Sequence, residues 1–290
     1  MVTKKVTAFD VVLVILMILL SAIFIYPLLN MLALSFSDSQ ELKSLPVYLM
    51  PKGFSLESYK ALLNDSRTIL YYWNTIQYAA VGTVIMLLTT SLMAYPLSIP
   101  SMRGRKLVSI LLTITMFFGG GLIPYYVTIM QLGMIDSFWV MVIPGAISAY
   151  NVIVFKTFFM SIPESLRESA GLDGAGHFRI LFQIILPLSK AVIATFALFS
   201  IVGYWNDYMT ALLYLRDDTK YPIQLLMRRL LVLMDYKDAS TAQLLKDYRA
   251  ISSRTTKAAA TIITVVPVLC VYPFMQKHFA KGVLVGSIKA

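Results

Sequence analysis

Residues 161–187 carry capping and turn-forming residues at a spacing that predicts a compact pair of short helices. Ser161 and Glu164 are spaced as the N-cap and N3 residues of a capping box, in which two side chains satisfy free backbone N–H groups. Pro163 is tolerated in a first helical turn, because its missing N–H would have no partner there. A short helix is therefore expected from residue 162 to about residue 172.

Gly174 marks the expected end of that helix, because glycine readily adopts the positive φ that closes a helix. Residues 175–185 can form a second short helix before Pro187 opens the next apolar run. The sequence thus predicts a compact helix–turn–helix knob.

A second candidate is a polar step inside a long apolar run. Asn206 and Asp207 are costly in hydrocarbon, about 2.5–3.5 kcal/mol for a central Asp, so they should face a helix bundle or a polar cavity. Two interpretations stay open, a place in a transport pathway or a structural hydrogen-bonded pair to another helix. Tyr204, Trp205 and Tyr208 could stack on the flat face of a ligand ring, although aromatic residues on such a helix more often serve packing.

Bond-making chemistry is not indicated by the sequence. His177 and His278 are the only histidines and lie far apart, so they support no catalytic or metal-binding constellation. The single cysteine, Cys270, excludes an intrachain disulfide and a cysteine-based metal cluster. The sequence also lacks the G-x-x-x-x-G-K-[ST] phosphate loop of ATP-hydrolysing subunits. We expect neither enzymatic activity nor a bound cofactor for this chain.

The elements that must position these residues are apolar. Hydrophobic residues make up 58% of the 290 residues, charged residues make up 14%, and the mean hydropathy is +0.73, outside the range of water-soluble domains. About 20 helical residues cross a hydrocarbon core. We expect an all-α, polytopic membrane protein with six transmembrane helices. The predicted spans, uncharged except for Asp207, are 11–37, 68–102, 107–135, 137–155, 191–215 and 258–276.

The distribution of basic residues orients these spans. Arg103, Arg105 and Lys106 crowd one short connection, whereas the short connection at 131–136 has no Lys or Arg. The positive-inside rule then places the first connection, the knob and both chain termini in the cytoplasm. The first span is expected to be a retained anchor, because it is too long for a signal peptide. Gly119–Gly121 predicts a break in the third span.

The knob also resembles a known family motif. Glu168-Ser169-Ala170, three residues, Gly174, nine residues and then Ile184-Ile185-Leu186-Pro187 is similar to the EAA loop of binding-protein-dependent ABC permeases, with Ser169 where the family usually has Ala. The resemblance implies a coupling helix that sits in a groove of a cytoplasmic ATPase. The implied ATPase-coupling residues are Glu164, Arg167, Glu168, Ser169, Ala170, Asp173, Gly174, Ala175 and Pro187.

Three further segments extend this resemblance to oligosaccharide permeases related to the smaller maltose-permease subunit, of the LplC/YtcP type. They are residues 51–59, Trp205-Asn206-Asp207 and the C-terminal segment 276–289. The resemblance implies the MetI-like fold of type I ABC importer permeases. It also implies a single transmembrane permease domain over residues 1–290, with the cytoplasmic coupling loop at 156–190, in the bacterial inner membrane.

The resemblance further implies the partners of this chain. They are a second homologous permease subunit forming a heterodimer, two cytoplasmic ABC ATPase subunits, an extracytoplasmic solute-binding protein, an oligosaccharide and the lipid bilayer. ATP and Mg²⁺ would be held by the ATPase subunits, and no nucleic acid is expected to bind.

The charge of the predicted outer loop 216–257 gives a hypothesis about the cargo. Nine basic residues less five acidic residues leave a net charge of +4 there, which favours an acidic, uronate-containing oligosaccharide or an acidic binding protein. Two alternatives stay open. They are an ABC permease for a non-sugar solute and a secondary transporter without ATPase partners.

Overall fold

The structure, a computed structural model, describes residues 7–39, 41–43, 49–233 and 254–270. These residues form helices joined by turns, and no β-strand occurs among them apart from an isolated bridge between Ser37 and Phe54. The predicted all-α class is confirmed. The chain divides into two compact units, residues 1–69 with 227–267 and residues 70–226 with 268–290.

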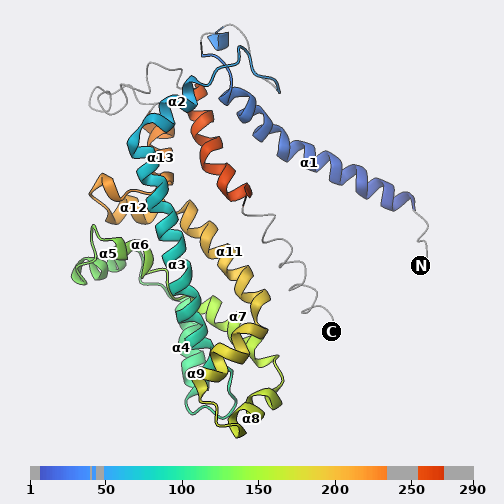
Figure 1. Cartoon of the computed structure of the whole chain (residues 1–290), viewed down its shortest axis with the longest axis vertical. Coiled ribbons are helices and arrows are strands. Elements are labelled where there is room, and N and C mark those ends of the chain that lie inside the picture. Colours follow the sequence, from blue (N-terminus) through green and yellow to red (C-terminus); the bar gives the residue numbers. More distant parts are fainter. Residues whose placement is uncertain (1–6, 40, 44–48, 234–253, 271–290) are drawn as a thin grey trace. The chain divides into compact units, whose positions relative to one another are not determined.

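The first unit begins with the long apolar helix α1, Ala8–Ser35, drawn in blue in Figure 1. Its 28 residues span about 42 Å at a rise of 1.5 Å per residue, enough to cross a bilayer. Thr7 and Asp10 form a capping box at its start, with Thr7 N donating to the Asp10 carboxylate at 2.8 Å. Only three residues at the end of α1 are buried. A helix that is apolar on every side is expected to be surrounded by lipid or protein.

The rest of this unit includes η1 (Glu41–Lys43), α2 (Glu57–Asn64), the end of α13 (Ile223–Leu233) from residue 227, and a helix at residues 254–270 as far as residue 267. The buried hydroxyl of Ser58 donates to the buried hydroxyl of Thr255 at 3.0 Å, which ties α2 to the last helix. Ala258 packs against the end of α1. The sixth predicted span is thus helical as far as residue 270, and its remainder lies outside the described residues.

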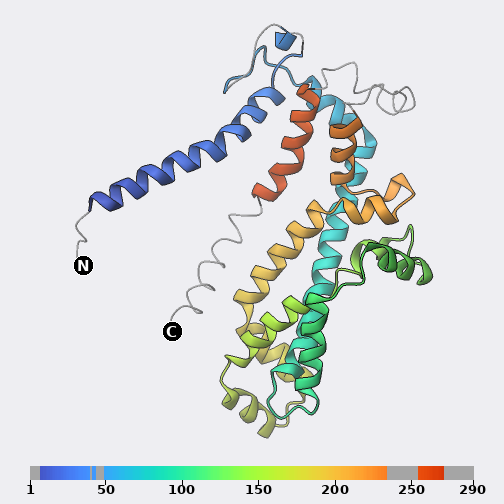
Figure 2. The ribbon, with the colours of Figure 1, turned by 180° about the vertical axis from the view of Figure 1, so that it is seen from behind.

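The second unit is built around α3, Ser66–Ser98, from residue 70 onward. In both Figure 1 and Figure 2, α4, α7 and α9 gather around the C-terminal half of α3. Their core includes Leu97 of α3, Leu112 of α4, Phe155 of α7 and Ile180 of α9. The helices that follow α3 are α4 (Arg105–Phe117), α5 (Leu122–Gln131), α6 (Phe138–Val142), α7 (Ala149–Met160), α8 (Glu164–Leu172), α9 (His177–Ile180), η2 (Leu181–Ile185), α10 (Leu186–Leu188), α11 (Lys190–Asn206), α12 (Met209–Tyr214), η3 (Asp218–Lys220) and α13 (Ile223–Leu233).

Two of the predicted spans are long continuous helices, α1 and α3. The third is broken at Gly119–Gly121 as predicted, and α4 and α5 meet there at 117°. The expectation of one helix per span is wrong for the fourth and fifth spans. Pro144 and Gly145 separate α6 from α7, and Asp207 and Tyr208 separate α11 from α12. Proline and glycine interrupt helices by removing a donor and by loosening the backbone.

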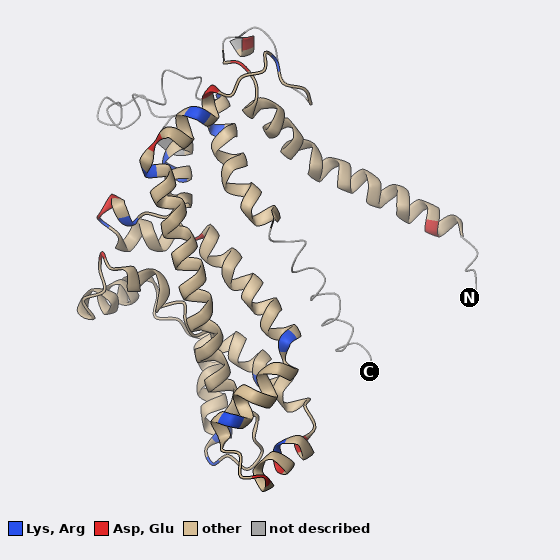
Figure 3. Cartoon of the chain, in the orientation of Figure 1, with Lys and Arg blue, Asp and Glu red and all other residues tan. Residues whose placement is uncertain are grey.

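Charged residues lie toward the two ends of the second unit. Figure 3 shows α3 and α11 tan along their middle, with blue and red residues gathered near α8 and α9 at one end and near α12 at the other. Arg67 is the only charged residue of α3, and Lys190 is the only one of α11. This pattern is typical of helices whose middle faces hydrocarbon and whose ends face water.

An ion-pair cluster lies at the end of this unit opposite the knob. The Asp136 carboxylate accepts the backbone N–H groups of Arg216 and Asp217, both at 3.0 Å, and contacts the Lys220 amine at 3.2 Å. These hydrogen bonds hold the pKa of Asp136 below its usual value, and those from Thr219 to Asp217 lower the pKa of Asp217. The cluster fastens the connection before α6 to the connection after α12.

Candidate functional site

The predicted knob is present, with α8 as its first helix. Its C-terminal end is a complete Schellman motif, in which Ala175 N donates to Ala170 O at 2.9 Å and Gly174 N donates to Gly171 O at 3.0 Å. Gly174 has φ +81°, as predicted. The two hydrogen bonds and the left-handed glycine give the end of α8 a defined geometry.

The predicted capping box at Ser161 and Glu164 is wrong. Helix α7 continues to Met160, so the Ser161 hydroxyl donates back to Phe158 O at 2.7 Å, and Pro163 is the N-cap of α8 without a side-chain hydrogen bond. A serine one residue after a helix can satisfy the last carbonyls of that helix. The helix therefore begins at Glu164, two residues later than expected.

Arg167 anchors α8 to the neighbouring helices. Its Nη1 donates to Ser98 O at the end of α3 at 3.4 Å, and its Nη2 donates to Phe159 O near the end of α7. The side-chain Nε is buried without a hydrogen-bond partner in the described part of the chain. Ala170 and Ala175 are partly buried beside the same core. The inner face of the knob is thus held by one arginine and two small residues.

The outer face of α8 is acidic and exposed. Glu164, Glu168, Ser169 and Asp173 are all exposed, and Leu172 keeps 90% of its surface accessible. Glu164, Glu168 and Leu172 follow one another at intervals of four residues and therefore share one side of the helix. This face offers carboxylates around an apolar side chain, which suits docking into a protein groove.

The segment after Gly174 is more irregular than the single helix predicted for 175–185. It consists of α9, a π-helical turn η2 and α10, in which Pro187 lies and is exposed. A proline inside a helix leaves the carbonyl four residues earlier without a donor, and a wider turn precedes it here. Ser189 ends the segment by donating to Ile185 O at 2.7 Å, and α11 leaves at 82° to it.

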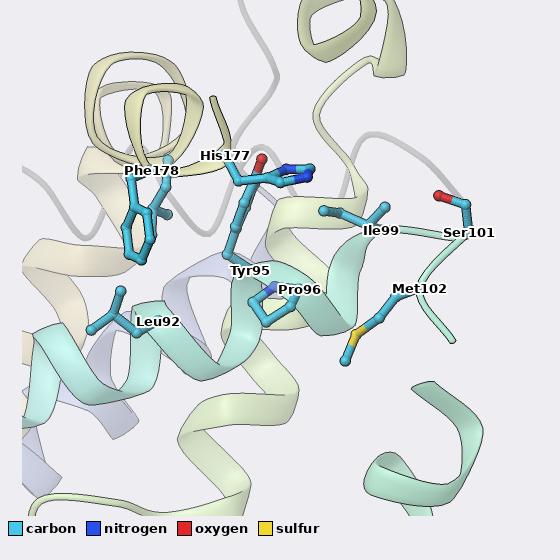
Figure 4. Close-up of a pocket in the computed structure, with 9 residues that line it drawn as sticks. Leu92, Tyr95, Pro96, Ile99, Ser101, Met102, His177 and Phe178 are labelled. Atoms are coloured by element: carbon cyan, nitrogen blue, oxygen red, sulfur yellow. The ribbon is translucent and has the colours of Figure 1, made fainter. Parts of the chain in front are cut away.

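A mostly apolar groove of about 680 Å³ lies beside α9 (Figure 4). Figure 4 shows Tyr95 and Pro96 of α3 on one side and His177 and Phe178 of α9 on the other, with Met102 at its margin. The rings of Tyr95 and His177 meet edge to face with centroids 6.2 Å apart. Residues of both α3 and α9 therefore line the groove, and the two helices contact each other through this ring pair.

The polar step near residue 206 opens onto a second cavity, of about 540 Å³. Tyr204, Asn206 and Asp207 line it, as do Tyr150 and Asn151 at the start of α7. These last two residues were not predicted, because no motif marks Tyr150 or Asn151 within its apolar run. The remaining lining residues are Met86, Gly145, Phe196, Phe199, Ser200 and Gly203.

The helix end at this cavity has a defined local cause. α11 stops at Asn206, and the Asp207 carboxylate accepts the backbone N–H of Thr210 at 3.0 Å at the start of α12. The Asn206 amide oxygen accepts a hydrogen bond from Gln224 at 3.2 Å. The two polar side chains are thus partly satisfied by the protein while both still border the cavity.

Tyr204 is held across the cavity by two close approaches. Its hydroxyl donates to Val142 O at 3.0 Å. Its ring lies against Gly82 of α3, where a Cβ would overlap the ring, and its hydroxyl lies against Gly145. Two glycines therefore make room for one tyrosine, a relationship that spacing in the sequence did not reveal.

Trp205 and Tyr208 do not line the cavity. Trp205 is buried and its ring lies 5.9 Å from that of Tyr72, and Tyr208 packs against the same apolar cluster. The structure therefore places Tyr204, Asn206 and Asp207 together and directs Trp205 and Tyr208 into packing. No group of three or more His, Cys, Asp and Glu side chains that could hold a metal occurs among the described residues.

Residues 2–285 match the family described as binding-protein-dependent transport system inner membrane component. The chain belongs to this family. It is an inner-membrane permease, and the predicted membrane architecture is confirmed at that level.

Two relatives of this permease come from Bacillus subtilis (strain 168). The polygalacturonan/rhamnogalacturonan transport system permease protein YtcP is 38% identical over 97% of this chain and 98% of its own length. Protein LplC is 39% identical over 99% of this chain and 97% of its own length. These matches confirm the LplC/YtcP-type resemblance.

A solved structure with the same fold belongs to a bacterial ABC transporter involved in the import of the acidic polysaccharide alginate. It superposes with a TM-score of 0.88 at 30% identity, covering 96% of this permease and 100% of that chain. The MetI-like, type I importer permease fold is thereby confirmed.

Proposed function

We propose that this permease is one half of the membrane channel of an ATP-driven oligosaccharide importer. A second, homologous permease subunit completes the channel, two cytoplasmic ABC ATPase subunits hold ATP and Mg²⁺, and a solute-binding protein delivers the cargo. The family description itself names dependence on a binding protein. In this proposal the chain catalyses no reaction. It docks to the ATPase subunits, and its spans change conformation to open a path for the cargo.

The observation that carries the proposal is the exposed acidic face of α8 combined with its anchored inner face. Arg167 joins α8 to backbone carbonyls of α3 and α7, the helices whose residues also border the polar cavity. A force applied to the outer face of α8 would therefore reach the helices of the cavity through the Arg167 side chain and through the packing of Ala170 and Ala175. Such a link can bias one conformation of the spans over another when ATP binds to a partner.

The polar cavity is the proposed place of cargo passage. Tyr150, Phe199 and Tyr204 provide aromatic surfaces, and Asn151 and Asn206 provide amides that can bind sugar hydroxyl groups. Asp207 is the only ionisable lining side chain apart from the tyrosines, and it would repel a uronate carboxylate placed directly beside it. Sugar hydroxyl groups, rather than carboxylates, are therefore expected to face this part of the path.

The proposed cargo class is acidic oligosaccharide. Its support is the relative YtcP, a polygalacturonan/rhamnogalacturonan transport system permease, the alginate-importing transporter with the matching fold, and the net charge of +4 in residues 216–257. Part of that segment, residues 234–253, lies outside the described residues. A non-sugar cargo remains the second candidate within the same family. The cytoplasmic position of both termini is proposed from the positive-inside rule alone.

Copurification tests the partnership directly. The importer, captured by a tag on this chain, should retain an ATP-hydrolysing subunit, and Glu168→Lys should release it because a cation replaces a carboxylate of the exposed acidic face. Glu57→Lys, at an exposed position of α2, is the matched control and should leave retention unchanged. Purification of the natural complex without any ATPase would contradict the proposal and favour a secondary transporter.

A further inference from the structure

A third cavity, of about 770 Å³, lies between α4 and α7. One end is basic, with Arg105, Lys106 and Lys156 in its lining. The other end is apolar and is formed by Phe117 and Phe118. This groove is separate from the polar cavity and from the groove beside α9, with which it shares no lining residue.

Among the described residues, the basic end has no acidic counter-ion. The Lys156 amine donates to the Ser109 hydroxyl at 2.9 Å, and Arg105 Nη2 lies 3.1 Å from Met160 Sδ. Within the described ranges, none of the salt bridges involves these two cations or Lys106. Three cations around one opening repel one another and therefore favour an anion with several acceptor oxygens.

The groove along α4 is about as long as one membrane leaflet is thick. From Lys106 to Phe118 the chain rises about 18 Å, close to half of a hydrocarbon core that is about 30 Å thick. Ile110 and Ile114 lie on this path and are exposed, as are the two phenylalanines. A cationic opening above a leaflet-long apolar groove matches a phosphate headgroup with an attached acyl chain. An oligosaccharide would instead need polar partners along the whole groove.

We propose that the α4–α7 groove binds one anionic phospholipid. Arg105, Lys106 and Lys156 hold the headgroup phosphate at the cytoplasmic boundary, and an acyl chain lies along α4 toward Phe118. Basic pockets between transmembrane helices on the cytoplasmic side bind such headgroups. Because Met160 directly precedes the connection to α8, the lipid would stabilise the packing of α4 against α7 next to the coupling loop.

Lipid binding to the purified importer tests this site. Phosphatidylglycerol and phosphatidylcholine with the same acyl chains are added to delipidated complex, and bound lipid is counted by native mass spectrometry. The complex should bind phosphatidylglycerol with clear preference. Lys106→Gln combined with Lys156→Gln should weaken that binding about 25-fold, because each basic residue contributes about 1 kcal/mol. Lys106→Gln alone should weaken phosphatidylglycerol binding about 5-fold. Because Lys106 is exposed, this single variant tests the site without altering the half-buried Lys156.

The control is Arg103→Gln combined with Lys190→Gln, which removes two exposed charges expected on the same membrane face but outside the groove. It should bind phosphatidylglycerol as the unchanged complex does. Equal loss in the control, or equal binding of phosphatidylcholine, would overturn the proposal. Displacement of the lipid by trigalacturonate would assign the groove to cargo instead. Thr113 also lines the groove. Efficient cross-linking of Thr113→Cys, in a Cys270→Ser background, to the second permease subunit would show that protein fills the groove.

Discussion

Arg167 is the side chain on which the link between α8 and the spans depends. Arg167→Met keeps the apolar stem and removes the hydrogen bonds to Ser98 O and Phe159 O. Hydrogen bonds to a charged group contribute about 1.5–3 kcal/mol, so we expect the ratio of cargo imported to ATP hydrolysed to fall about tenfold or more. Transport and ATP hydrolysis measured together in proteoliposomes check this.

Arg179→Met is the matched control for that change. Arg179 is exposed on α9, and its Nε donates to Gln183 at 2.9 Å within the same segment. Its loss should leave the coupling ratio within twofold. If both variants behave alike, the anchoring role of Arg167 is wrong.

Gly174 closes α8 with φ +81°, a conformation that costs a β-branched residue about 1–3 kcal/mol. Gly174→Val should therefore uncouple ATP hydrolysis from uptake while the chain still inserts into the membrane. Gly133→Val is the control, because Gly133 has φ +66° in a turn at the end opposite the knob. It should carry similar strain without uncoupling, and unchanged uptake by the Gly174 variant would contradict the coupling assignment.

Gly82 leaves space for the Tyr204 ring at the polar cavity. Gly82→Ala should displace that ring, break its hydrogen bond to Val142 O and reduce uptake several-fold. Gly203→Ala is the control, since Gly203 lines the same cavity and a Cβ there meets nothing within 4 Å. Concentration-dependent uptake of radiolabelled cargo gives the comparison. Equal effects of the two substitutions would show that Tyr204 does not depend on Gly82.

At the residue scale, the sequence predicted best where one residue type has one strong local role. Gly174 was assigned its left-handed turn correctly because glycine adopts that conformation at low cost. The Ser161–Glu164 capping box failed because the preceding helix, α7, extended over the serine. Which of the residues 204–208 face a cavity could not be predicted, because Asp207 ends α11 and changes the direction of the chain after it.

At the scale of elements, chain breaks were predictable where glycines cluster. Gly119–Gly121 does separate α4 from α5. The break between α6 and α7 has a comparable cause in Pro144-Gly145, but these residues are uncharged and therefore do not interrupt the uncharged run that predicted the span. Lengths of uncharged runs thus identify membrane-crossing segments and do not reveal how many helices form each crossing.

The stabilising effect of the Asp136 cluster, which joins the connection before α6 to the connection after α12, should depend on pH. Hydrogen bonds from Arg216 and Asp217 lower the pKa of Asp136, so its stabilising effect is present above the unfolded pKa, about 3.9, and is lost as pH falls through the lower folded value. Asp136→Asn should therefore lower the melting temperature of the detergent-solubilised complex at pH 7. The difference from the unchanged complex should disappear in strong acid.

Asp218→Asn is the control for this cluster. Asp218 is exposed at the start of η3 and takes no part in the ion pairs of the neighbouring Asp217. Its melting temperature should follow that of the unchanged complex at every pH. A difference between the Asp136 variant and the unchanged complex that stays constant down to pH 2 would show that the effect is not ionic.

At the scale of the whole molecule, membrane insertion and import identity rest on different grounds. The uncharged spans and the exposed apolar surface of α1 follow from the physics of lipid. Membership of the permease family follows from the match over residues 2–285.

The proposal of an acidic cargo is supported by the relatives and by the net charge of residues 216–257. Uptake of galacturonate and matched neutral oligosaccharides should favour the acidic ones, and equal or better uptake of the neutral ones would contradict the cargo proposal.

The most direct test of the central claim is cargo uptake by the complete importer in proteoliposomes, measured with and without ATP and with and without the solute-binding protein. The account predicts accumulation that requires both, with ATP hydrolysis stimulated by the loaded binding protein and uncoupled from uptake by Arg167→Met. Accumulation without ATP, driven by an ion gradient, would contradict it.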